Sequence, residues 1–208
     1  QHRHFTAHSF MVARVSFRLL CEFYAIIMKL NYHISSTPAD TAKAAADYLI
    51  ERLQAIRRKK GRATLALSGG VTPQLMLEQI AGREFDWNAV HIFWVDERCV
   101  PPDHPASNYR MIREALLVPT GIPEDQTHRV EGELFPEQAA ARYAFKIRDF
   151  FRLGEKEFPS FDIVHLGMGL DSHIASLFPN QPLILDRTHI AASIDCVPPQ
   201  GTRITLLP

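Results

Sequence analysis

The sequence contains little cysteine: its 208 residues include only Cys21, Cys99 and Cys196, and no two of them form a CxxC pair. Disulfide frameworks of small secreted domains use an even number of closely spaced cysteines, and zinc sites repeat a fixed Cys/His spacing. Neither pattern is present. We therefore expect reduced thiols in a cytoplasmic protein, with Cys99 as a structural thiol rather than a nucleophile.

The sequence also lacks a net charge and a long apolar run. Its 23 Lys and Arg residues balance 23 Asp and Glu residues, so there is no overall basic field of the kind that non-specific nucleic-acid binders carry. No apolar run reaches the roughly 18 residues of a membrane-spanning helix. Hydrophobic residues nevertheless make up 46%, an ordinary globular share. We expect one domain with a sizeable core and neither nucleic-acid nor membrane partners.

Residues 1–28 differ from the rest of the chain in charge and patterning. They carry three arginines and one glutamate, a net +2, which leaves −2 for residues 29–208. We expect a non-conforming N-terminal extension at 1–28, with a basic presequence as the alternative, and an α/β domain at 29–208. Because RITLLP at 203–208 reads as a strand with nothing after it, this domain is expected to be incomplete at its C-terminal end.

Short apolar runs alternate with stretches of helical periodicity along residues 29–208. We predict strands at 63–67, 90–95, 161–166, 189–194 and 203–207, and helices at 39–59, 72–80, 107–117 and 136–151. This alternation indicates βαβ units and a mainly parallel sheet. In such sheets ligands bind outside the carboxyl ends of the strands. Polar motifs follow three of the predicted strands, so we expect these motifs to converge on one pocket.

The first of these motifs, SGGVTP at residues 68–73, lies between a predicted strand and a predicted helix. Consecutive glycines let backbone N–H groups approach an anion, and the start of the following helix attracts negative charge. The motif predicts a phosphate or sugar-phosphate cradle, with a plain strand–helix turn as the alternative. A nucleotide P-loop is excluded because GxxxxGK[ST] is absent.

The second motif, Asp96-Glu97-Arg98, ends the second predicted strand. A guanidinium group at this place can bind a phosphate through paired hydrogen bonds, and the two carboxylates can orient it. The alternative is a solvated, charged turn.

The third motif, GMGLDSHIASLFP at residues 167–179, carries the most information. Its start imitates GxGxxG, but Ser172 replaces the third glycine, so a dinucleotide site is poorly supported. We instead expect a tight glycine turn that displays Asp171 and His173. A histidine is suited to general-base work at neutral pH, and a nearby carboxylate can fix its tautomer. The alternative is a capping aspartate beside an incidental histidine.

Other histidines lie inside predicted strands. His165 and His91 are each surrounded by apolar residues, and a single histidine in such a place is expected to be a hydrogen-bonded core residue. A zinc site would require three scattered histidines to converge without any spacing signal, so we predict no metal.

The segments SGGVTP, VDERCVPPDHPASNYRM, HRVEGE and FDIVHLGMGLDSHIASLFP, in this order, resemble the 6-phosphogluconolactonase family over about residues 30–208. The family is similar in fold to glucosamine-6-phosphate deaminases and ribose-5-phosphate isomerases. The resemblance implies a Rossmann-like, mainly parallel sheet with helices on both faces. It also implies hydrolysis of 6-phospho-D-glucono-1,5-lactone to 6-phospho-D-gluconate in the oxidative pentose phosphate pathway, without metal or organic cofactor. We expect a monomer or weak homodimer whose partner is this small sugar-phosphate lactone.

The resemblance also implies residue roles. His173 becomes the general base that activates water, and Asp171 is its neighbour in the site. The implied substrate-binding set is Ser68, Gly69, Gly70, Thr72, Arg98 and Gly169. The family usually has Gly-His-Thr where this chain has Ser172-His173-Ile174. If that position adopts a positive φ, Ser172 is expected to impose strain of about 1–2 kcal/mol.

Two other functions remain open. A deaminase or isomerase on the same scaffold would act on glucosamine 6-phosphate, but such enzymes typically show DEY and a Phe-Asn-Glu-Pro continuation. This chain has Asp-Glu-Arg at 96–98 and Ser-Leu-Phe-Pro at 176–179. A non-catalytic sugar-phosphate sensor would keep the pocket without the chemistry, and Ser172 is the feature that favours it. Measuring turnover beside binding separates these alternatives.

Overall fold

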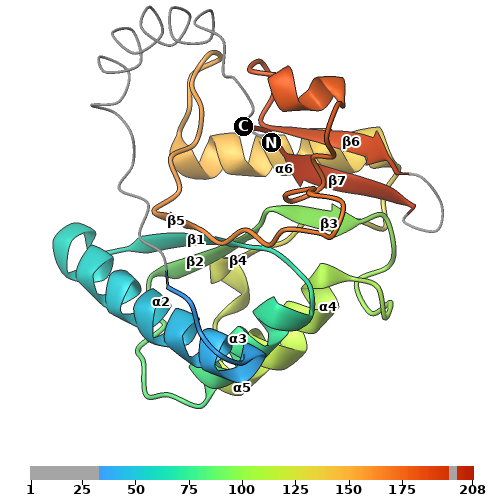
Figure 1. Ribbon diagram of the computed structural model, residues 1–208. Coiled ribbons are helices and arrows are strands. Elements are labelled where there is room, and N and C mark those ends of the chain that lie inside the picture. Colours follow the sequence, from blue (N-terminus) through green and yellow to red (C-terminus); the bar gives the residue numbers. More distant parts are fainter. Residues whose placement is uncertain (1–32, 197–200) are drawn as a thin grey trace, which may run out of the picture. The chain divides into compact units, whose positions relative to one another are not determined.

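The computed structural model describes residues 33–196 and 201–208. The chain divides into two units, Gln1–Ile34 and Ser35–Pro208, and the fold is that of the second unit (Figure 1). The extension predicted at 1–28 lies outside the described residues. Within the described part of the chain, no helix combines the length and the apolar character that a membrane crossing needs.

The longest helix, α2, spans Pro38–Lys60 and matches the prediction for 39–59. The Thr37 hydroxyl accepts a hydrogen bond from the Asp40 N–H at 3.1 Å, and Pro38 occupies the first turn, where its missing N–H costs nothing. Gly61 ends the helix in the left-handed conformation with φ 77°. Its buried residues recur at helical spacing and face the sheet and α3. Local signals alone therefore define this element.

In the described residues, the central sheet is parallel and has four strands. They are β1 (Ala63–Leu67), β2 (Val90–Trp94), β4 (Thr127–His128) and β5 (Ile163–Val164), in the order β4-β2-β1-β5. Every pairing is parallel, so the predicted α/β fold with a parallel sheet is confirmed. All five residues of β1 are buried, as expected of a central strand in such a sheet. The prediction for 161–166 was too long, since β5 pairs over two residues with β1.

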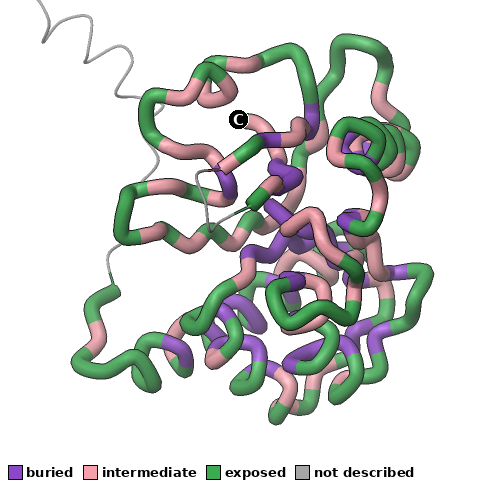
Figure 2. The backbone as a smooth tube through the Cα atoms, turned by 90° about the vertical axis from the view of Figure 1, so that its right-hand side faces the viewer, coloured by how far each residue is buried: buried purple, intermediate pink, exposed green. Residues whose placement is uncertain are grey.

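Helices cover both faces of this sheet (Figure 1). One face carries α2, α3 (Val71–Ala81), α4 (Asn108–Ile112) and α5 (Val118–Thr120), and the other carries α6 (Pro136–Phe151). A π-helical turn at Arg113–Leu117 joins α4 to α5, so the single helix predicted at 107–117 is interrupted. Figure 2 shows buried residues gathered between these layers and exposed residues along the outer turns.

A second, antiparallel sheet has three strands in the described part of the chain, and the sequence analysis did not group them together. They are β3 (Asp96–Arg98), β6 (Ala191–Asp195) and β7 (Thr202–Leu206), in the order β3-β7-β6. Val95 connects the two sheets: its N–H donates to Leu67 in the parallel sheet, and its carbonyl accepts from Leu206 in the antiparallel sheet. The chain thus passes from one sheet to the other at a single residue. The second motif, Asp96-Glu97-Arg98, follows directly and forms β3 of the antiparallel sheet.

A half-buried pair of histidines lies at the β2–β4 edge. His91 Nδ1 is 3.1 Å from His128 Nε2, and the His128 ring stacks on Phe93 with ring centres 4.4 Å apart. His91 is thus satisfied by a partner, as predicted, although it is half-buried. Burial, followed by the nearby charges of His91 and Lys146, lowers the pKa of His128 to about 4.

This lowered pKa makes stability sensitive to acid. An unfolded histidine titrates near pH ~6.5, so between that pH and about 4 the unfolded state binds a proton that the folded state does not. The free energy of unfolding therefore rises with pH across this window and is lost as pH falls. We expect His128→Phe, which keeps a ring against Phe93, to lose less Tm than the wild type between pH ~7.5 and pH ~4.5. Equal losses in thermal melts of the two proteins would contradict this expectation.

Candidate active site

The three motifs meet around one cavity of about 420 Å³. It lies at the carboxyl ends of β1 and β5 and beside β3, which is where parallel α/β sheets bind ligands. All predicted site residues except Asp171 line it: Ser68, Gly69, Gly70, Thr72, Arg98, Gly169 and His173. Asp171 does not line the cavity itself but is hydrogen-bonded to His173, which does.

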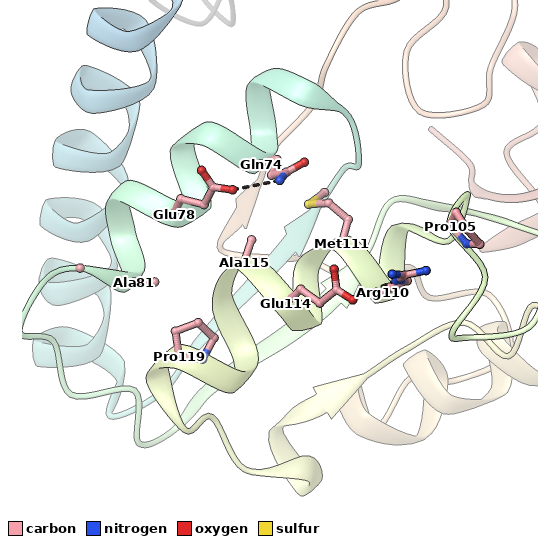
Figure 3. Close-up of a pocket in the computed structure, with 10 residues that line it drawn as sticks. Gln74, Glu78, Ala81, Pro105, Arg110, Met111, Glu114, Ala115 and Pro119 are labelled. Atoms are coloured by element: carbon pink, nitrogen blue, oxygen red, sulfur yellow. Dashed lines mark hydrogen bonds and ion pairs between the residues drawn. The ribbon is translucent and has the colours of Figure 1, made fainter.

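A larger opening of about 770 Å³ lies elsewhere, between α3 and the α4–α5 segment (Figure 3). Its polar side chains mostly satisfy one another: Gln74 Nε2 donates to Glu78 at 2.9 Å, and Arg110 Nε donates to Glu114 at 2.9 Å. None of the predicted site residues lines it. We place the site in the smaller cavity because the motifs converge there.

The first motif forms a turn that depends on its glycines. Gly70 adopts φ 117°, which a residue with a side chain rarely does. A Cβ on Gly69 would lie 1.8 Å from Asn108 Oδ1, so only glycine lets the Asn108 side chain occupy its place. The helix α3 begins directly after this turn, and no described side chain caps its start. Its first N–H groups are therefore free to bind an anion.

The charged residues of the second motif point in different directions. The Glu97 carboxylate is buried and accepts hydrogen bonds from Ser107 Oγ and from the Asn108 and Tyr109 N–H groups, at 3.0, 2.8 and 2.7 Å. It thereby caps the start of α4, and burial raises its pKa. Glu97 is structural, whereas Arg98 faces the cavity.

Arg98 is held by groups that orient its guanidinium. Its Nη1 donates to the Ala106 carbonyl at 2.7 Å and to Asn108 Oδ1 at 2.9 Å. Its Nε is buried without a hydrogen-bond partner among the described residues. A guanidinium held in this way on a cavity wall fits an anion that binds from the cavity side.

A second guanidinium, that of Arg203 on β7, lines the same cavity and was missed by sequence reasoning. It is buried, lies 3.7 Å from Asp96 Oδ2, and its Nε likewise has no partner in the described residues. Asp96 also accepts a hydrogen bond from Ser176 Oγ at 2.7 Å. The available signal was an arginine in a predicted strand whose other residues are apolar except for Thr205. Asn108, at the start of the helix predicted at 107–117, also lines the cavity and was missed as well.

In the third motif, His173 and Asp171 form a short hydrogen bond of 2.5 Å between Nδ1 and Oδ1. The bond to His173 holds the pKa of the Asp171 carboxyl below its usual range, so this carboxylate is ionised at neutral pH and accepts the Nδ1 proton. The Nε2 atom then carries the free electron pair that a general base requires. A Cβ on Gly169 would lie 2.2 Å from His173 Cε1, which explains the need for glycine there.

Ser172 adopts φ 66°. This is the positive φ under which a serine, in place of the family's glycine, was expected to impose strain. We expect Ser172→Gly to raise the free energy of unfolding by about 0.5–1 kcal/mol, because the relieved strain exceeds the added freedom of the unfolded glycine. Activity should be equal or higher. Ser172→Ala is the matched control, since it keeps the Cβ and removes the hydroxyl. Denaturant titration of the three proteins tests this, and a gain shared by alanine would show that the Cβ is not the cause.

His165 does not lie in the core as predicted. It is half-buried, lines the cavity, and places Nδ1 3.0 Å from Ser68 Oγ. The pattern of apolar neighbours was misleading because Val164 and Leu166, on either side of it, are exposed. Cys99 is half-buried, and burial, followed by the charge of Glu97, raises the pKa of its thiol to about 11. It is therefore protonated at neutral pH and a poor nucleophile.

Comparison with known proteins gives one consistent result. A family model described as glucosamine-6-phosphate isomerases/6-phosphogluconolactonase matches residues 36–207. The chain is 43% identical over 146 residues to a 6-phosphogluconolactonase of Nostoc sp., covering 69% of this chain and 61% of that protein. It is 40% identical over 154 residues to one of Treponema pallidum, covering 72% and 63%.

A solved structure agrees with these relatives. The 6-phosphogluconolactonase from Trypanosoma cruzi has a TM-score of 0.75 at 30% identity, covering 84% of this chain and 73% of that one. The chain spans 61% and 63% of the length of the two curated relatives.

Proposed function

The chain belongs to the family of glucosamine-6-phosphate isomerases and 6-phosphogluconolactonases, and from this premise we propose that it hydrolyses 6-phospho-D-glucono-1,5-lactone to 6-phospho-D-gluconate. The observation that carries the proposal is the hydrogen bond between His173 Nδ1 and the Asp171 carboxylate, which leaves Nε2 as the ring nitrogen available to act as a base beside a cavity containing Arg98. The names of the relatives support a lactonase. A general base and an anion-binding group in one cavity suit a phosphorylated ester.

The proposed chemistry requires only groups of this kind. Nε2 of His173 takes a proton from water as the water oxygen attacks the lactone carbonyl carbon. The tetrahedral intermediate then expels the ring oxygen, the C–O ester bond breaks, and the proton on His173 passes to the departing oxygen. The ionised Asp171 stabilises the imidazolium between these steps. The product is an open-chain hydroxy acid, which ionises to a carboxylate.

The substrate phosphate is proposed to bind at the first two motifs. Ser68, Gly69, Gly70 and Thr72 surround the start of α3, and Arg98 faces the same cavity. Arg203 supplies a second positive charge, which Asp96 offsets in part. Two guanidinium groups and an uncapped helix start at one cavity suit a phosphate dianion. Gly169 has no side chain, so the His173 ring can lie close to the turn of the third motif.

The wider setting is proposed on the same grounds. We propose that the protein acts in the oxidative pentose phosphate pathway and works in the cytoplasm, where Cys99 and Cys196 would stay reduced. The chemistry above needs no metal or organic cofactor. We propose a monomer or weak homodimer, with neither nucleic acid nor membrane as a partner.

A lactonase assay on purified protein tests the proposal. Glucose-6-phosphate dehydrogenase generates the lactone in situ, and spontaneous hydrolysis is subtracted. We expect turnover by the wild type and only background hydrolysis by His173→Asn. Ammonia release from glucosamine 6-phosphate would instead support the deaminase. Binding of 6-phosphogluconate without turnover of either substrate would support the sensor, which the strain at Ser172 favours.

Arg98 has a prediction of its own. Arg98→Ala should weaken substrate binding by roughly ten- to a hundredfold, the worth of a charge-assisted contact. Arg98→Lys should retain part of the affinity, because lysine keeps the charge and loses the paired geometry. KM and the affinity for 6-phosphogluconate measure both effects. Equal affinities in wild type and Arg98→Ala would remove Arg98 from the phosphate site.

A further inference from the structure

Ser68 and His165 form a hydrogen-bonded pair on the cavity wall, and the proposed reaction gives the His165 side chain no role. We propose that His165 is a positioning residue. Its ring accepts a hydrogen bond from the Ser68 hydroxyl when no ligand is bound, and it donates one to Ser68 Oγ when the hydroxyl donates to the substrate phosphate. This inference rests on the proposed function, because it assumes that the anion bound near Ser68 is the phosphate of the substrate.

The backbone fixes this pair from both sides. Ser68 directly follows β1 and is 4% exposed. The His165 N–H donates to the Ala66 carbonyl at 2.8 Å, which keeps His165 alongside the end of β1. A Cβ on Gly167 would lie 3.6 Å from Ser68 Oγ, so the chain beyond His165 also passes close to the hydroxyl. Ser68 therefore has two directions for its hydrogen bonds: the His165 ring and the cavity.

The protonation of His165 makes a change of direction feasible. Burial lowers the pKa of His165, so the ring is neutral at neutral pH and has one donor nitrogen and one acceptor nitrogen. Without a ligand, the Ser68 O–H can donate to Nδ1 at 3.0 Å. When an anion arrives, the O–H turns to a phosphate oxygen. His165 then releases the Nε2 proton to water and takes one from water at Nδ1, and Nδ1–H donates to Ser68 Oγ. The ring's net charge is unchanged.

This exchange keeps a buried hydroxyl satisfied in both states. A buried polar group that loses its partner costs about 1–3 kcal/mol, and an aliphatic side chain at position 165 would leave Ser68 Oγ with one partner fewer. A lysine could only donate. An asparagine presents both an acceptor and a donor near the position of Nδ1, so it is the conservative substitute for this role.

The test is a mutant cycle with two readouts. His165→Leu, Ser68→Ala and the double variant are compared with the wild type for KM and kcat, and for the affinity of 6-phosphogluconate by calorimetry. We expect each single variant to raise KM and the dissociation constant by about three- to tenfold, with kcat within about twofold. The double variant should be no worse than either single one. His165→Asn should recover most of the affinity.

The control is His189→Leu, which replaces an exposed histidine that pairs with Asp186 and does not line the cavity. It should match the wild type in both readouts. A merely structural role for His165 would lower Tm in His165→Leu and leave the affinity of the folded protein unchanged, which would overturn the inference. Additive losses, or no recovery in His165→Asn, would do the same.

Two outcomes separate this inference from the proposed function. If Ser68→Ala lowers kcat as far as His173→Asn does, Ser68 takes part in the chemistry and the positioning role is wrong. If the wild type has no lactonase activity but the calorimetric pattern holds for 6-phosphogluconate, the reaction is wrong and the anion-binding role of the pair stands.

Discussion

His173→Asn is expected to lower the catalysed rate of lactone hydrolysis by ~10²–10⁴-fold, the usual worth of a positioned proton acceptor. The side chain lies on an exposed turn, and its only polar side-chain partner in the described residues is Asp171. Asparagine can keep a contact with Asp171 but cannot accept a proton from water at neutral pH. The fold and the affinity for 6-phosphogluconate should therefore be preserved while kcat falls.

The pH profile separates this role from a loss of packing. The wild-type rate should fall on acidification, because a protonated imidazole cannot take a proton from water. Asp171 contributes no step to the profile at neutral pH, since its pKa is held below its usual range. His173→Asn should lose the acid limb. A variant that keeps both the wild-type rate and its pH dependence would mean that another group is the base.

Gly69→Ala is expected to have the largest effect on stability, about 2–4 kcal/mol, because the new methyl group overlaps a buried side chain. A Cβ at position 69 lies 1.8 Å from Asn108 Oδ1, so Asn108 must move. It would then lose its hydrogen bonds to Arg98 at 2.9 Å and to the Asp96 carbonyl at 2.9 Å. Because Arg98 loses a support at the same time, the affinity for 6-phosphogluconate should fall as well.

Three further variants show whether the overlap is the cause. Gly82→Ala adds the same methyl group where the nearest atoms lie 3.9 Å away, so its free energy of unfolding should stay within about 0.5 kcal/mol of the wild type. Gly69→Ala in an Asn108→Ala background should cost little more than Asn108→Ala alone. Denaturant titration measures the wild type and the four variants. A full additive cost in the double variant would show that Asn108 is not what the methyl group meets.

The sequence alone determined those parts of this protein whose signals are local. Helix α2 has its cap at Thr37 and its stop at Gly61, and the apolar run of β1 fits a strand buried on both faces. The three motifs could be predicted to converge, because parallel strands present their carboxyl ends at one edge. Asp171 and His173 lie two residues apart, so their contact needed little more than the turn between them.

Only the tertiary structure decided which other residues join them. The last two predicted strands do not join the parallel sheet. They form β6 and β7 of the antiparallel sheet, where β7 pairs with β3, directly after Val95. That pairing brings Arg203 beside Asp96, and the β1–β5 pairing brings His165 to Ser68, 97 residues away in sequence. Contacts over such separations depend on strand order and register, which short-range periodicity does not encode. Hydrophobic patterning shows which residues are apolar, but sheet pairing decides which polar side chains meet.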